Sequence, residues 1–139
     1  YIHHGDKLGV LLELNCETDF VAKTEGFNGL ANNLAMQIAA TNPISIDRDS
    51  IDENYLQKEE SIFKEQALSS GKPENVVDKI VKGKLEKLFS EICLLDQLYI
   101  KDTDKKISDL LNEAIATLGE NIVIARFIRF AVGENSSSS

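Results

Sequence analysis

The eight residues at positions 15–22, Asn-Cys-Glu-Thr-Asp-Phe-Val-Ala, place an acid beside a large aromatic side chain where an apolar segment becomes helical. The acid is Asp19 and the aromatic residue is Phe20. Such a pair on a rigid corner is suited to insertion into a partner protein, not to bond chemistry of its own. The residues alone leave two interpretations open. Thr18 caps a short helix whose Phe20 enters the core, or Asp19 and Phe20 protrude as a wedge.

Few other side chains could perform chemistry. His3 and His4 are the two histidines, and as neighbours on a predicted strand they point to opposite faces. Cys16 and Cys93 lack the close cysteine partner that a zinc site requires. Cys16 with a histidine would make a hydrolase or redox nucleophile, but no third orienting group is evident. We therefore expect no metal site, no cofactor and no covalent catalysis.

Composition limits the class of protein. The chain has 139 residues, of which 42% are hydrophobic and 27% charged, as in ordinary globular domains. Its net charge of −8 disfavours direct binding to nucleic acid or to an anionic membrane surface. No apolar run approaches the roughly 20 residues of a membrane-spanning helix. Residues 1–134 are predicted to form the domain and residues 135–139 a disordered Ser-rich tail. Because the chain starts at Tyr1, we expect a piece of a longer protein.

Two β-rich ends enclose a helical middle. Residues 1–4 and 7–16 suit a hairpin with its turn at residues 5–6, and residues 121–132 suit another strand. Caps and apolar stripes predict five helices, and residues 99–104 read as an extended crossing segment. The helices are expected at 18–23, about 27–42, 53–69, 74–92 and 107–118, where the end of the fourth is set by the last residue of its apolar stripe, Ile92. This order predicts an α+β fold of two layers, a small antiparallel sheet of N-terminal hairpin and C-terminal strand packed on several helices.

The strand at 121–132 is apolar on both faces. Strict alternation puts Ile122, Ile124, Ile128 and Phe130 on one face and Val123, Ala125, Phe127 and Ala131 on the other. The helices of one chain can cover one face of a small sheet, so the second needs another cover. We expect a homodimer, or a second repeat in the parent protein. The predicted interface residues are Val123, Phe127, Ile128 and Phe130.

Several motifs, in order along the chain, resemble the elongation factor Ts family. They are Tyr-Ile-His at 1–3, Gly-Val-Leu at 9–11, Leu-Asn-Cys-Glu-Thr-Asp-Phe-Val-Ala-Lys at 14–23, Met-Gln-Ile-Ala-Ala at 36–40, Ser-Gly-Lys-Pro at 70–73, Lys-Gly-Lys-Leu-Glu-Lys at 82–87, Glu-Ile-Cys-Leu at 91–94, Gly-Glu-Asn-Ile at 119–122 and Arg-Phe-Ile-Arg-Phe at 126–130. The resemblance covers nearly all of residues 1–134. It is to the core or dimerisation part of a short form with one core repeat, without the N-terminal helical module.

The resemblance implies a guanine nucleotide exchange factor for elongation factor Tu in translation elongation, acting without covalent chemistry. It implies that Asp19 and Phe20 insert near the magnesium and nucleotide site of that GTPase. The implied partner-binding residues are Thr18, Asp19, Phe20 and Val21, the turn Leu118, Gly119, Glu120 and Asn121, and His3, for which His4 is an alternative match. The implied location is the bacterial cytoplasm or an organellar stroma or matrix. The alternative is a dimerisation or interaction module, without exchange activity, from a longer organellar protein.

Overall fold

The computed structural model describes residues 1–134, which form two compact units. The predicted tail at 135–139 lies outside the described residues. The first unit joins Tyr1–Asn42 to the chain from Leu98 onward, and the second is Pro43–Gln97. The first unit contains β1 (Leu8–Asn15), α1 (Asp19–Ala22), α2 (Glu25–Thr41), β2 (Leu98–Tyr99), β3 (Asp102–Lys106), α5 (Ile107–Leu118) and β4 (Val123–Ala131). Helices with two antiparallel strand pairs confirm the predicted α+β class.

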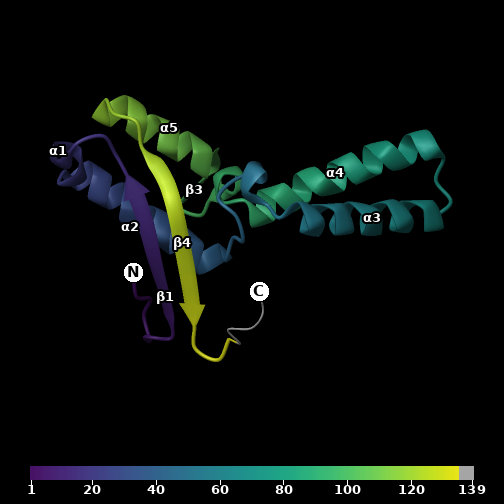
Figure 1. The fold of residues 1–139 in the computed structure, drawn as a ribbon, viewed down its shortest axis with the longest axis horizontal. Coiled ribbons are helices and arrows are strands. Elements are labelled where there is room, and N and C mark those ends of the chain that lie inside the picture. The colour runs from purple at the N-terminus through teal and green to yellow at the C-terminus, as the bar shows by residue number, and fades with distance from the viewer. Residues whose placement is uncertain (135–139) are drawn as a thin grey trace. The chain divides into compact units, whose positions relative to one another are not determined.

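The first unit is built around β1 and β4, which run side by side in opposite directions (Figure 1). Helix α2 packs against β1, and α5 packs against α2. The apolar stripe of α2 is buried, with Leu34 and Ile38 fully covered, and Val10 and Ile122 of the same unit are buried too. Arg129 of β4 donates a hydrogen bond to the carbonyl of Ala39 in α2, 3.2 Å away. One face of the sheet, here called the inner face, is therefore covered by α2.

The predicted N-terminal hairpin is present in reduced form. Tyr1 and Val10 exchange two backbone hydrogen bonds of 2.8 Å, one of them through the α-amino group, and the His3 amide donates to Leu8 at 2.9 Å. The turn uses Gly5 at φ 90° and Asp6 at φ 58°, left-handed conformations that an ordinary L residue avoids. Residues 1–4 form a single isolated bridge, from Ile2 to Gly9, instead of the predicted strand.

The predicted facing of β4 is wrong beyond Ile124 because the strand contains a β-bulge. Leu14 pairs with Ile124 and Glu13 pairs with Arg126, so Ala125 is an extra residue without a partner in the register. An extra residue shifts the alternation by one. Phe127 therefore points to the inner face with Ile124, while Ile128 points to the opposite, outer face.

The predicted crossing segment at 99–104 is a tight hairpin instead. Tyr99 of β2 pairs with Asp102 of β3, and Tyr99 is buried. A fully buried side chain of α2, Gln37, stabilises this turn. Its amide donates to the carbonyl of Leu98 at 3.0 Å and accepts from the amide of Ile100 at 2.9 Å. The β2–β3 hairpin is too short to pair all of its backbone polar groups, and the Gln37 side chain of α2 forms hydrogen bonds with two of them.

The second unit consists mainly of α3 (Glu53–Ser69) and α4 (Glu74–Ile92), an antiparallel pair, with 3₁₀ turns at Arg48–Ser50 and Leu94–Asp96. The predicted bounds of α3 are confirmed, and α4 begins directly after Pro73 as predicted. Ala67, Val77 and Val81 form the buried contact between the helices. Near the other end, Arg48 bonds both carboxylate oxygens of Glu86, at 3.0 and 2.9 Å.

Candidate functional site

The segment singled out by its sequence lies between the end of β1 and the start of α2. Thr18 is the N-cap of α1, with extended backbone angles, and its hydroxyl accepts a hydrogen bond from the Val21 amide at 3.4 Å. Thr24 caps α2 in the same way, and its hydroxyl donates to the Val21 carbonyl at 2.7 Å. Two successive caps therefore hold the one-turn helix α1 between them.

Phe20 lies on the solvent side of this short helix. Its exposed fraction is 87%, the highest of the exposed large hydrophobic residues in the part of the chain that the structure describes. Val21, the next residue, is 9% exposed and anchors α1 to the core. Asp19 is exposed beside Phe20 in the first turn. Of the two interpretations left open by the sequence, a Phe20 in the core is therefore wrong for this chain. Residues 18–20 are called the tip below.

Glu120 connects the tip to the far end of the chain. One carboxylate oxygen accepts from the amides of Glu17 and Thr18 at 3.2 and 3.0 Å. The other accepts from the Thr18 hydroxyl at 2.6 Å. We call these three hydrogen bonds the clasp. They join residues more than 100 positions apart, and periodicity in the sequence carries no signal for such a contact.

The turn after α5 carries Glu120. Helix α5 ends at Leu118, and Gly119 follows at φ 74° with its amide bonded to the Ile115 carbonyl, as in a left-handed C-cap. Asn121 is exposed, whereas Ile122 is 2% exposed and fixes the chain in the core. The structure thus brings the predicted turn at 118–121 to the predicted tip.

His3 lies elsewhere. Its amide bonds to Leu8, at the end of β1 opposite Asn15, and an eight-residue strand spans about 24 Å. Its ring nitrogen Nδ1 is 2.8 Å from the Tyr1 hydroxyl. Cys16 directly follows β1 and its thiol donates to the Thr18 carbonyl at 3.2 Å. A Cys16 and His3 pair is therefore not assembled.

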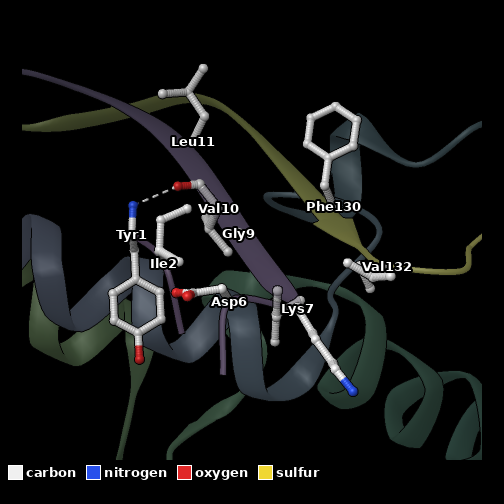
Figure 2. Close-up of a pocket in the computed structure, with 11 residues that line it drawn as sticks. Tyr1, Ile2, Asp6, Lys7, Gly9, Val10, Leu11, Phe130 and Val132 are labelled. Atoms are coloured by element: carbon white, nitrogen blue, oxygen red, sulfur yellow. Dashed lines mark hydrogen bonds between the residues drawn. The ribbon is translucent and has the colours of Figure 1, made fainter. Parts of the chain in front are cut away.

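The outer face of the β1–β4 sheet is apolar and open. It carries Val123, Ile128 and Phe130, which are 48%, 49% and 68% exposed, together with Leu11 at 72%. Figure 2 shows Leu11 and Phe130 projecting to the same side of the two strands. At the end of the sheet where β1 begins and β4 ends, an open hollow of about 510 Å³ is lined by residues that include Ile2, Leu11, Phe130 and Val132. Phe127, predicted to share the interface, lies half-buried on the inner face instead.

The described residues 1–134 hold no group of three or more His, Cys, Asp or Glu side chains that could bind a metal ion. None of their helices is long and apolar enough to cross a membrane. The second cysteine, Cys93, is fully buried in the second unit, and this burial raises the pKa of its thiol to about 11. A thiol of this kind is poorly suited to act as a nucleophile.

Comparison with known proteins gives consistent results. The family model described as Elongation factor TS matches residues 1–134. The chain is 57% identical over 134 residues to the elongation factor Ts of Moorella thermoacetica, covering 96% of this chain and 66% of that relative. It is 55% identical over 133 residues to that of Oleidesulfovibrio alaskensis, covering 96% and 67%, and 55% identical over 139 residues to that of a Thermoanaerobacter species, covering 100% and 68%. The chain thus spans about two thirds of the length of these relatives.

Proposed function

Because the chain belongs to the elongation factor Ts family, we propose that it acts in translation elongation by promoting the release of GDP from elongation factor Tu. Its place of action is then the compartment that holds the translation machinery, a bacterial cytoplasm or an organellar matrix or stroma.

The observation that carries the proposal is the exposure of Phe20. Aromatic side chains are usually buried, yet α1 holds Phe20 outward, 87% exposed, between its N-cap residue Thr18 and the buried Val21. A fixed, exposed aromatic residue can enter a pocket of a partner at little cost in conformational entropy. This is the property that a wedge needs.

Exchange follows from differential binding. A factor that binds the nucleotide-free GTPase more tightly than the GDP-bound form weakens GDP binding by the same ratio. A thousandfold faster release requires about 4 kcal/mol off the barrier. Burial of one phenylalanine side chain supplies about 1.5–3 kcal/mol of binding energy, a substantial part of that requirement.

The other predicted contacts divide into two regions. Asp19 carries its charge next to Phe20, where it would repel the phosphates or disturb the magnesium coordination of the partner. The exposed Asn121 lies on the turn that the clasp holds against the tip, so it would touch the same partner domain. His3, at the far end of β1, would reach a different part of elongation factor Tu.

The test is release of a fluorescent GDP analogue from elongation factor Tu. The wild-type chain should accelerate release, and a folded Asp19→Ala/Phe20→Ala variant should not. Leu68→Ala is the matched control, because it removes an apolar side chain that is 50% exposed in the second unit. Binding without acceleration by the wild type would favour the alternative, an interaction module without exchange activity.

We also propose that the outer face pairs with the outer face of a second copy. A two-stranded sheet with exposed Leu11, Ile128 and Phe130 lacks a cover on that side, and a two-fold axis would place like residues against each other. Val123 lies on the same face. Phe127 is not part of this interface, because the bulge at Ala125 turns it inward.

Sedimentation velocity tests the pairing. The wild type should sediment as a dimer and Phe130→Glu as a monomer, because the variant buries a charge in the proposed interface. Phe20→Glu is the control, since it makes the same change at an exposed phenylalanine outside the outer face. Equal sedimentation of all three proteins would disprove the pairing.

A further inference from the structure

The clasp gives Glu120 a role distinct from partner contact. A carboxylate offers about four acceptor positions, and three hydrogen bonds from residues 17 and 18 already use most of them. The side chain is half-buried, so little of it is left to meet another protein. Its hydrogen-bonding capacity is directed at the segment that leads into Phe20.

The clasp is continuous with the first turn of α1. The Thr18 hydroxyl donates to Glu120 and accepts from the Val21 amide, so one hydroxyl links the carboxylate to the helix cap. Phe20 lies between these two attachment points. Hydrogen bonds to an ionised carboxylate are roughly twice as strong as those between neutral groups, which makes this link the stronger of the two.

The base of the clasp is itself fixed. Gly119 closes the C-terminus of α5, and Ile122 is buried directly before β4 begins. Glu120 therefore projects from a turn anchored on both sides, whereas residues 16–18 connect a strand end to a four-residue helix. The anchored turn can impose its geometry on the less constrained segment.

We propose that Glu120 is a positioning residue that holds the tip in the geometry required for nucleotide exchange. This inference rests on the proposed function. Without the clasp, the tip samples more conformations, and binding has to order it each time. Misplacement of a group that acts on a reaction centre by about 1 Å can cost up to about a hundredfold in rate.

Hydrogen exchange measures the clasp without reference to activity. In Glu120→Ala, the amide protons of Glu17 and Thr18 should exchange at least tenfold faster than in the wild type, since each loses its acceptor. Glu25→Gln is the control for loss of a negative charge, because Glu25 is an exposed first-turn acid of α2 outside the clasp. Unchanged exchange at both amides would overturn the proposal.

A double-mutant cycle then separates positioning from direct contact. Glu120→Ala alone should slow the stimulated release of the GDP analogue about ten- to a hundredfold. In the Asp19→Ala/Phe20→Ala background, the same substitution should have little further effect, because the side chains that it positions are gone. Equal effects in both backgrounds would mean that Glu120 contacts the partner itself, and no effect in the wild-type background would mean that the clasp is dispensable. Either result overturns the proposal.

Failure of the proposed function has a different signature. If the wild-type chain binds elongation factor Tu without accelerating release, the same double-mutant cycle is measured through the binding affinity for elongation factor Tu. A loss of affinity from Glu120→Ala in the wild-type background, but not in the Asp19→Ala/Phe20→Ala background, still supports positioning. If the wild type neither binds nor accelerates release, both proposals fail, even where hydrogen exchange shows the clasp to be present.

Discussion

Replacement of Phe20 by alanine should impair exchange and spare the fold, and the same substitution at Phe27 should do the reverse. The two residues lie seven positions apart, on successive helices. Phe20 is 87% exposed, whereas Phe27 is 6% exposed beneath the Thr24 cap. The pair therefore separates a side chain that serves a partner from one that serves the core.

The magnitudes follow from these exposed fractions. Full burial of a phenylalanine side chain contributes about 1.5–3 kcal/mol, so the 87% of Phe20 left exposed makes about 1.3–2.6 kcal/mol available to a partner. If that energy is gained in the transition state for release, Phe20→Ala should slow stimulated release about ten- to eightyfold. Its effect on the free energy of unfolding should stay within about 0.5 kcal/mol. Phe27→Ala empties a buried site and should cost about 3–5 kcal/mol of stability.

Denaturant unfolding and the GDP-analogue release assay should be run on both variants beside the wild type. The stability change in Phe20→Ala is the shift of the denaturation midpoint, measured where the slope of unfolding free energy against denaturant concentration is the same as in the wild type. A loss of stability above about 2 kcal/mol in Phe20→Ala would refute the assignment of an outward-facing side chain. Normal release by a stable Phe20→Ala would refute its role as the wedge.

Four further predictions concern the two cysteines, Arg48 and Gln37. Burial raises the pKa of the Cys93 thiol to about 11, so the folded state keeps a proton that the unfolded state loses near pH 9, and stability should fall as pH rises from about 9 to about 11. Denaturant titrations should show a smaller fall in Cys93→Ala, which keeps only the contribution of groups such as Tyr55 and Tyr99, whose pKa values burial also raises. An alkylating reagent should modify the half-buried Cys16 well before Cys93 in the native protein, and equal rates seen by mass spectrometry would contradict the burial of Cys93. Arg48→Lys should cost about 1 kcal/mol in the second unit, because a lysine cannot bond both oxygens of Glu86; unchanged amide exchange in α4 would mean that the pair contributes nothing. Gln37→Leu should cost about 1–3 kcal/mol by removing two buried hydrogen bonds, and an unchanged thermal midpoint would show that the β2–β3 turn does not depend on them.

The local features of the fold were predictable because short-range rules decide them. Pro73 before α4, Asn42 in a left-handed C-cap after α2 and Gly119 after α5 each mark a helix end through backbone geometry. The cap at Thr18 follows from the same kind of rule, which predicts that the tip lies at the start of a helix.

The errors concern features that long-range packing decides. Both faces of β4 are apolar in the sequence, so no change in an alternating pattern marks the extra residue at Ala125. The exposure of Phe20 was also undecidable, because a capped helix start suits a buried or an exposed aromatic residue equally well. The clasp of Glu120 joins distant segments through one carboxylate, and an acid after a C-cap glycine is unremarkable in a sequence read alone.

The contact between Gln37 and the β2–β3 turn bears on how this fold can be divided and recombined. The second unit leaves the first after Asn42 and rejoins it at Leu98, and Gln37, five residues before Asn42 on the same helix, bonds the carbonyl of Leu98. The chain therefore leaves the first unit and re-enters it within about two turns of α2. Domains whose ends meet in this way tolerate excision and substitution of the inserted segment. The stretch from 43 to 97 is thus a modular insertion, and a short linker in its place would leave the tip, its clasp and the outer face on one small chain.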